Sequence, residues 1–159
     1  MKHSIITAFL GRTQDRFSEY QEPTSLSERI KIIQRVNGVS GFEVVYPYAT
    51  GEAGETKELI EKSGLSFAPF NANIKKEKQW VPGALSRPDA NLRNGAINII
   101  KGAKDFAKAM GAPLVTCCPL SDGYDHLFQV DYPLAWRHMI ESSRKQQIIY
   151  PRFHYLLNI

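Results

Sequence analysis

Amide, carboxylate, phenol and imidazole side chains gather where apolar stretches of this sequence end. Such groups donate and accept hydrogen bonds, so together they suit the binding of a small molecule rich in hydroxyl groups. We predict that six of these residues contact such a substrate: Tyr46, Asn71, Asn73, Asp122, Tyr124 and His126. The sequence identifies no catalytic residue and no metal ligand.

Each of these side chains also has a structural interpretation. Asn71 and Asn73 are two residues apart and therefore share one face of a strand, where amides can bind hydroxyl groups. Amides at a strand end can instead form hydrogen bonds within a turn. Asp122 and Tyr124 lie in a turn-rich segment. His126, in the same segment, can equally bond to a neighbouring group or to water.

Glu43 stands inside an otherwise apolar stretch, "GFEVVYPY". A carboxylate there could point into the protein interior. Because a buried charge without a partner is costly, we expect Glu43 to pair with a lysine or arginine in the interior or to lie on the outer surface.

The elements that must position these side chains alternate regularly. Apolar, β-branched stretches predict strands at 3–11, 41–48, 65–74 and 112–119. Apolar residues at spacings of three and four predict helices at 24–38, 54–64, 88–111 and 130–145. Ser25 and Glu28 have the spacing of a capping box, Gly64 is expected to stop the second helix, and Asp131 to cap the fourth.

Four alternations of strand and helix predict an α/β chain with parallel strands covered by helices. Such units form either an open doubly wound sheet or a (β/α) barrel. The first loop, "LGRTQDRFSEYQEP", lacks the G-x-G-x-x-G pattern of a dinucleotide-binding sheet. Polar residues at the strand ends are typical of the catalytic face of a barrel, so we favour the barrel.

Composition excludes several classes of protein. With 43% hydrophobic and 23% charged residues, the chain is typical of a soluble globular protein. No apolar run approaches the roughly 20 residues that cross a bilayer, and no signal peptide is recognisable, so we expect no membrane association and a cytoplasmic location. Cys117 and Cys118 are adjacent, which predicts reduced thiols rather than a disulfide.

Several segments in this order resemble the sugar isomerase and epimerase proteins with a xylose isomerase-like TIM barrel. The similar segments span residues 1–145: "SIITAFLG", "GFEVVYPY", "FNANIK", "KGAKDFAKAMGAPLVTCCPLSDGYDH" and "DYPLAWRHMIESSRK". The resemblance implies isomerisation or epimerisation of a sugar or sugar phosphate by proton or hydride shift. It also implies a divalent metal (Mg, Mn, Co or Zn), held by carboxylates and histidine at the ends of the fifth to eighth strands.

The length predicts only half of such a barrel. A complete barrel takes about 250 residues, whereas this chain has 159 and leaves its regular pattern near Lys145. We therefore expect the first four βα units without the metal-bearing strands, so that this chain binds no metal and is inactive alone.

Residues 146–159, "QQIIYPRFHYLLNI", form a separate, divergent tail. These residues can also be considered in a shifted reading frame, in which the third base of each codon is joined to the first two bases of the next codon. Among the codons that could encode residues 146–159, one choice gives A-A-D-Y-I-P-E-I-P-L-F-I-E-Y in that frame. That string resembles the family's fifth strand with its first metal-binding Glu. We predict a barrel half at 1–145 followed by out-of-frame translation at 146–159. The alternative is a genuine C-terminal tail.

Two other functions fit the sequence less well. One is a binding or assembly module, in which two half barrels form a homodimer through their open edges. The other is a DNA-repair endonuclease related to endonuclease IV, which the net charge of +4 keeps open. Lys and Arg are dispersed outside "IKKEK", which we interpret as a solvated loop, so nucleic acid is not the favoured partner.

Overall fold

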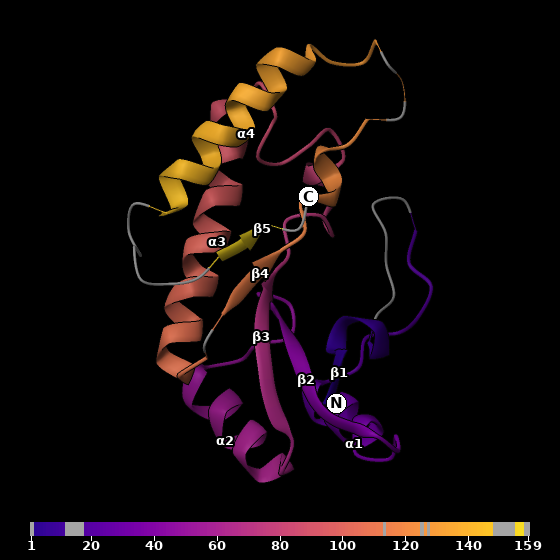
Figure 1. Ribbon diagram of the computed structural model, residues 1–159. Coiled ribbons are helices and arrows are strands. Elements are labelled where there is room, and N and C mark those ends of the chain that lie inside the picture. Colours follow the sequence, from indigo (N-terminus) through magenta and orange to yellow (C-terminus); the bar gives the residue numbers. More distant parts are fainter. Residues whose placement is uncertain are drawn as a thin grey trace.

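Strands and helices alternate along the chain in the computed structural model, which describes residues 2–11, 18–112, 114–124, 126, 128–147 and 155–157 (Figure 1). The elements are β1 (His3–Ile6), η1 (Thr7–Leu10), α1 (Leu26–Ile33), β2 (Val39–Tyr46), α2 (Ala53–Ser63), β3 (Ser66–Ala72), η2 (Lys78–Trp80), α3 (Ala90–Met110), β4 (Val115–Cys117), η3 (Leu120–Asp122), α4 (Tyr132–Gln147) and β5 (Tyr155–Leu157). The strands pair in the order β1-β2-β3-β4-β5, and each pair is parallel. The predicted α/β alternation is confirmed.

Local sequence signals set the helix ends. The Ser25 side chain accepts from the Glu28 backbone and the Glu28 carboxylate accepts from Ser25, which confirms the capping box of α1. Helix α2 ends at Gly64, whose φ of 68° is in the left-handed region that glycine adopts without strain. At α4, the Asp131 carboxylate accepts from the Leu134 backbone N–H at 3.0 Å, as its predicted cap position requires.

The first strand is shorter than predicted. Pairing with β2 ends at Ile6, and Thr7–Leu10 form a turn of 3₁₀ helix instead. Leu10 packs against the core, and Thr7 is fully buried. An apolar run satisfies a strand and a buried turn equally well, so packing rather than local pattern fixes this boundary.

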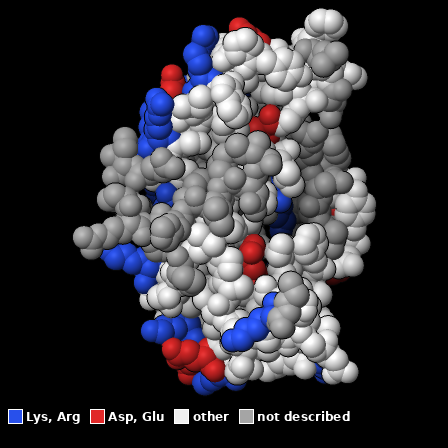
Figure 2. Space-filling model, in the orientation of Figure 1, with Lys and Arg blue, Asp and Glu red and all other residues white. Residues whose placement is uncertain are grey.

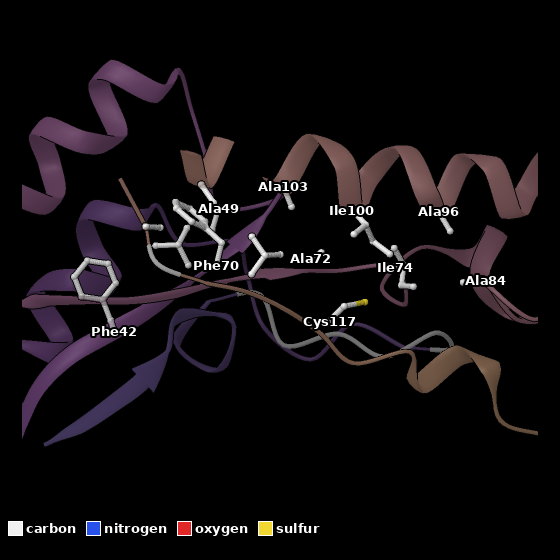
Figure 3. Packing of buried hydrophobic residues seen from close by; sticks show 14 of the residues in the cluster. Phe42, Ala49, Phe70, Ala72, Ile74, Ala84, Ala96, Ile100, Ala103 and Cys117 are labelled. Atoms are coloured by element: carbon white, nitrogen blue, oxygen red, sulfur yellow. The ribbon is translucent and has the colours of Figure 1, made fainter. Parts of the chain in front are cut away.

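One face of the sheet packs on α3. Phe70, Val115 and Cys117 are fully buried there, and Ala96, Ile100 and Ala103 of α3 belong to the same core cluster (Figure 3). The small alanine side chains let the helix approach the sheet closely, because little volume separates the two backbones. This apolar layer makes α3 a fixed support for β3 and β4.

The opposite face of the sheet is polar where β2, β3 and β4 meet. Val45 pairs with Asn71, and Asn71 pairs with Thr116. Because side chains alternate along a strand, these residues point away from the face that holds Phe70 and Val115. Glu43, two residues before Val45, lies on the same side. We call Glu43, Asn71 and Thr116 the inner polar row.

The predicted boundary at residue 145 falls inside a helix, because α4 continues to Gln147. Gln146 is fully buried, and its carbonyl and side-chain oxygens accept hydrogen bonds from Lys104 Nζ at 2.9 and 2.7 Å. Farther on, β5 pairs with β4. An uncovered strand edge offers backbone groups to any β-prone segment within reach, which explains this pairing. Residues 148–154 and 158–159 of the predicted tail lie outside the described residues.

No helix in the described parts of the chain combines the length and apolar character needed to cross a membrane.

Candidate functional site

The inner polar row is hydrogen-bonded across strands. The Asn71 amide Nδ2 donates to Thr116 Oγ1 at 3.0 Å, and Thr116 Oγ1 donates to the Phe70 carbonyl at 3.4 Å. Asn71 and Thr116 are only 8% and 9% exposed. Buried polar groups held in this way have fixed positions, which is what recognition of a hydroxyl group requires.

Glu43 is the titratable group of this row. Burial raises the pKa of its carboxyl to about 7, while the positive charge of Lys75 and a hydrogen bond from Asn71 act in the opposite direction. Its Oε1 atom is buried and has no hydrogen-bond partner in the described part of the chain. A carboxyl that titrates near neutral pH can both take and give a proton, as a general acid or base must.

Sequence reasoning considered Glu43 but did not choose it as a site residue. The two expectations were a pairing with a basic residue in the interior and a position on the outer surface; Glu43 is half-buried, and the positive charge of Lys75 lowers its pKa. The signal was available, because a single acidic residue interrupts an apolar strand. The cost of burying a charge argued for an ion pair; burial instead keeps much of the carboxyl neutral.

Asn73 is buried but occupied within a turn. Its Oδ1 accepts hydrogen bonds from the backbone N–H groups of Lys75 and Lys76 at 3.1 and 3.0 Å. Its own N–H donates to the Tyr46 carbonyl at 3.0 Å. This is the turn role that the sequence left open for the amide. The turn fixes the backbone of Lys75 at the end of β3.

Tyr46 lies on the other side of the sheet. Its ring centroid is 5.8 Å from that of Phe106 on α3, and a Cβ added at Gly102 would come within 2.6 Å of its hydroxyl. Tyr46 is two residues after Val44, which is in the helix-packed core, and so shares that face. The structure therefore does not bring Tyr46 to Asn71, and we omit it from the candidate site.

Asp122 holds a loop through four hydrogen bonds. Its Oδ1 accepts from the backbone N–H of Ala84 at 2.9 Å and from the N–H and hydroxyl of Ser86, both at 2.7 Å. Its Oδ2 accepts from the Leu85 N–H at 3.1 Å. We call Asp122 with residues 84–86 the Asp122 clamp. The clamp ties the β3–α3 connection to the segment after β4, and it occupies the carboxylate that we predicted to contact substrate.

Side chains from α4 and its preceding loop complete this region. The Tyr124 hydroxyl lies 3.4 Å from Ser86 Oγ. The Ser142 hydroxyl donates to the Leu85 carbonyl at 2.8 Å, and His138 Nδ1 lies 3.3 Å from the Ser86 carbonyl. Tyr124 thus borders the Asp122 clamp. The His126 side chain is exposed, and only its backbone has described hydrogen bonds, with Gln129.

The residues present do not form a site for the divalent metal that the resemblance implies. The described residues contain no group of three or more His, Cys, Asp or Glu side chains placed to hold a metal ion. The inner polar row offers one carboxylate with an amide and a hydroxyl, whereas such cations prefer several carboxylate or imidazole ligands. We therefore assign no metal-dependent step to these residues.

The charged side chains do not gather into a stripe on the face in Figure 2. Basic groups lie along the upper left, over α4, and mix with acidic groups at the lower end, over α2. A nucleic-acid groove would need Lys and Arg clustered on one face. This face therefore offers no support for the endonuclease alternative.

Comparison with solved structures shows the fold of half a TIM barrel. A D-psicose 3-epimerase from Clostridium cellulolyticum H10, solved with D-tagatose, is 17% identical with a TM-score of 0.64; the match covers 99% of this chain and 52% of that one. A D-tagatose 3-epimerase-like protein is 13% identical with a TM-score of 0.69 over 99% and 51% of the two chains. A xylose isomerase domain protein from Planctomyces limnophilus is 10% identical with a TM-score of 0.59 over 97% and 51%.

The chain thus spans about half the length of the barrels it resembles, which confirms the predicted half-barrel fold. At these identities the likeness establishes fold and not activity. No protein-family model matches the sequence, and a search of curated proteins gives no match.

Proposed function

We propose that this chain supplies the N-terminal half of a sugar or sugar-phosphate isomerase or epimerase and binds part of the substrate on its inner polar row. The observation that carries the proposal is the hydrogen-bonded pair of buried Asn71 and Thr116, with half-buried Glu43 on the same face, where apolar side chains would otherwise be expected. Carboxyl, amide and hydroxyl groups complement sugar hydroxyls. The xylose isomerase-like fold supports this substrate class by analogy.

Glu43 has the chemistry that such a reaction needs from its protein. Isomerisation and epimerisation both move a proton between a carbon or oxygen atom and a basic group. A carboxyl with a pKa near 7 exchanges protons readily at neutral pH. A hydrogen bond with Asn71 lowers that pKa, against the effect of burial. The chain alone is expected to bind sugars without turning them over, since the implied metal-binding strands follow the fourth βα unit.

Saturation-transfer NMR with ketohexoses and aldohexoses tests this binding on the purified chain. Wild-type protein should give sugar signals that Asn71→Ala abolishes, because the amide is then absent and the Thr116 hydroxyl loses the donor that positions it. Asn91→Ala, in the first turn of α3, is the matched control and should leave the signals unchanged. Absence of any sugar signal from folded wild-type protein would contradict the proposal. Turnover by the chain alone, measured by chromatography of the products, would contradict its inactivity.

A second candidate function is assembly of a barrel from two copies. Within the described residues β1 pairs only with β2, and β5 only with β4, so both edges of the sheet lack a further strand. A two-fold axis parallel to the strands would bring the β1 edge of one copy beside the β5 edge of the other in parallel orientation. Light scattering should then give twice 18.0 kDa, whereas a single species of 18.0 kDa at high concentration would count against assembly.

We also propose that residues 146–159 arise from a shifted reading frame. The coding DNA tests this directly. If a frame shifted near codon 145 encodes further predicted strands, the proposal is supported. If the shifted frame encodes no such sequence, the proposal is refuted.

A further inference from the structure

Two Asn-Gly pairs in this chain have different backbone surroundings. Asn37 and Gly38 lie between α1 and β2, whereas Asn94 and Gly95 lie inside α3. An asparagine followed by glycine is chemically labile, because glycine has no Cβ to keep its backbone nitrogen away from the asparagine side chain. The structure around each pair therefore decides whether the side-chain amide can react.

The first pair forms an exposed turn. The Val39 N–H donates to the Val36 carbonyl at 3.4 Å, which closes a turn with Asn37 and Gly38 at its centre. Both central residues are exposed, and Gly38 has a φ of 82°. A Cβ added at Gly38 would have nothing within 4 Å. The turn thus leaves open space around the peptide bond that joins the two residues.

The reacting atoms of this pair are not held by other groups. Within the described residues, no hydrogen bond is found for the Asn37 side-chain amide or for the Gly38 N–H group. Helix α1 ends at Ile33 and β2 begins at Val39, so the pair lies outside both elements. The Gly38 nitrogen can therefore approach the Asn37 side chain without the loss of a described hydrogen bond.

The second pair is held in a helix. Asn94 and Gly95 lie in the second turn of α3, where each backbone N–H donates to the carbonyl four residues earlier. A Cβ added at Gly95 would lie 3.7 Å from the Trp80 ring. The Asn94 side chain is exposed like that of Asn37, so access of solvent does not distinguish the two asparagines. Reaction at Asn94 requires this part of the helix to open first.

The reaction needs only water. The Gly38 nitrogen attacks the side-chain carbonyl carbon of Asn37, so an N–Cγ bond forms and the Cγ–Nδ2 bond breaks. The side-chain nitrogen leaves as ammonia and takes the proton of the Gly38 N–H group. Water then opens the resulting succinimide ring at either carbonyl carbon. One opening gives aspartate, and the other gives isoaspartate, in which the backbone runs through the former side chain.

We infer that Asn37 is a site of spontaneous deamidation and isoaspartate formation in the folded chain, whereas Asn94 is protected by α3. The inference does not depend on sugar binding, so it goes beyond the proposed function.

The products change the connection that leads into β2. Both carry a new negative charge, and isoaspartate also lengthens the backbone by one carbon atom. Strand β2 starts two residues after Asn37 and pairs with both β1 and β3. A longer connection disturbs the turn that fixes where this central strand begins. The melting temperature of the chain should therefore fall as the modification accumulates.

Peptide mapping of the aged protein tests the site. Folded protein is incubated for days at mildly alkaline pH and then cleaved after lysine, which separates Asn37 in peptide 32–57 from Asn94 in peptide 79–101. Mass spectrometry of the fragments locates the modified residue. We expect Asn37 to react at least about tenfold faster than Asn94, since that ratio corresponds to about 1.4 kcal/mol, the order of one hydrogen bond that must open in α3. In urea, where α3 is unfolded, the two rates should become similar.

Matched variants connect the modification with stability. Asn37→Gln should remove the modification in peptide 32–57 and keep its melting temperature during incubation. Asn94→Gln is the control and should lose melting temperature as the wild type does. Freshly purified samples of both variants verify that each is folded at the start.

Three results would overturn the inference. In folded protein, Asn37 could react no faster than Asn94. The same ratio of rates could persist in urea, which would mean that the helix is not what protects Asn94. Wild type and Asn37→Gln could lose melting temperature equally. Sugar binding is measured separately on fresh protein, so its failure would leave this inference standing, and the reverse also holds.

Discussion

The inner polar row and the Asp122 clamp each centre on one carboxyl group, but they satisfy it differently. Asp122 accepts four hydrogen bonds from the segment 84–86. Glu43 keeps a buried oxygen without a described partner, and burial raises its pKa to about 7. A carboxylate whose acceptor sites are filled by backbone groups stabilises a loop. One with an oxygen that lacks a described donor can accept a hydrogen bond from a ligand, so hydrogen-bond satisfaction distinguishes the two carboxyl groups.

The largest change in the free energy of unfolding is expected from Asp122→Ala. The change leaves the N–H groups of Ala84, Leu85 and Ser86 without their acceptor, and we expect a loss of about 3 kcal/mol in the free energy of unfolding. Urea denaturation monitored by circular dichroism measures it. Glu61→Ala, at an exposed position of α2, controls for the loss of an acidic residue. A loss below about 1 kcal/mol would show that solvent replaces the clamp.

Gln146→Ala tests a polar contact remote from both regions. The variant removes one of the two acceptors described for the buried Lys104 ammonium, so we expect a loss of about 2 kcal/mol in the same denaturation experiment. Gln79→Ala, on the exposed η2 turn, is the matched control. Equal stability of the two variants would mean that Gln146 does not pack against α3.

At high pH, Glu43→Gln should increase the free energy of unfolding, whereas the two variants above decrease it. Because the pKa of Glu43 rises from 4.5 to about 7 on folding, the folded chain binds more protons between these values and loses stability as pH increases through them. Allowing for the partial exposure of Glu43, we expect the variant to be more stable than wild type by about 1 kcal/mol at pH 8. At pH 4 the two proteins should be nearly equal.

Melting curves at both pH values check this, with Glu61→Gln on α2 as the control for losing a carboxylate. If Glu43→Gln lowers stability at pH 8, the carboxylate is stabilised by partners and the contrast with Asp122 fails.

The smallest change in stability is expected from His126→Ala. Its side chain is exposed, so the free energy of unfolding should change by less than about 0.5 kcal/mol. The same denaturation series measures it. A larger loss would show that the imidazole makes a stabilising contact in the folded chain.

Much of the fold follows from local sequence. The capping box at Ser25, the left-handed Gly64 and the cap at Asp131 are short-range signals, and each marks the predicted helix end. The end of β1 was not predictable, because an apolar run is compatible with both strand and buried turn. The face that Tyr46 occupies could not be predicted either, since proximity to a strand end does not tell to which side of the sheet a side chain points.

The sequence by itself determined the alternation of strands and helices and the presence of an acidic residue within an apolar strand. Periodicity and capping are local, so they can be read along the chain. Only the tertiary structure decided which carboxyl group has its acceptor oxygens filled by hydrogen-bond donors. Asp122 accepts hydrogen bonds from donors 36 to 38 residues away, and Glu43 on β2 is affected by the charge of Lys75, which follows the neighbouring strand β3. Such pairings depend on strand register and on burial, which no local pattern contains.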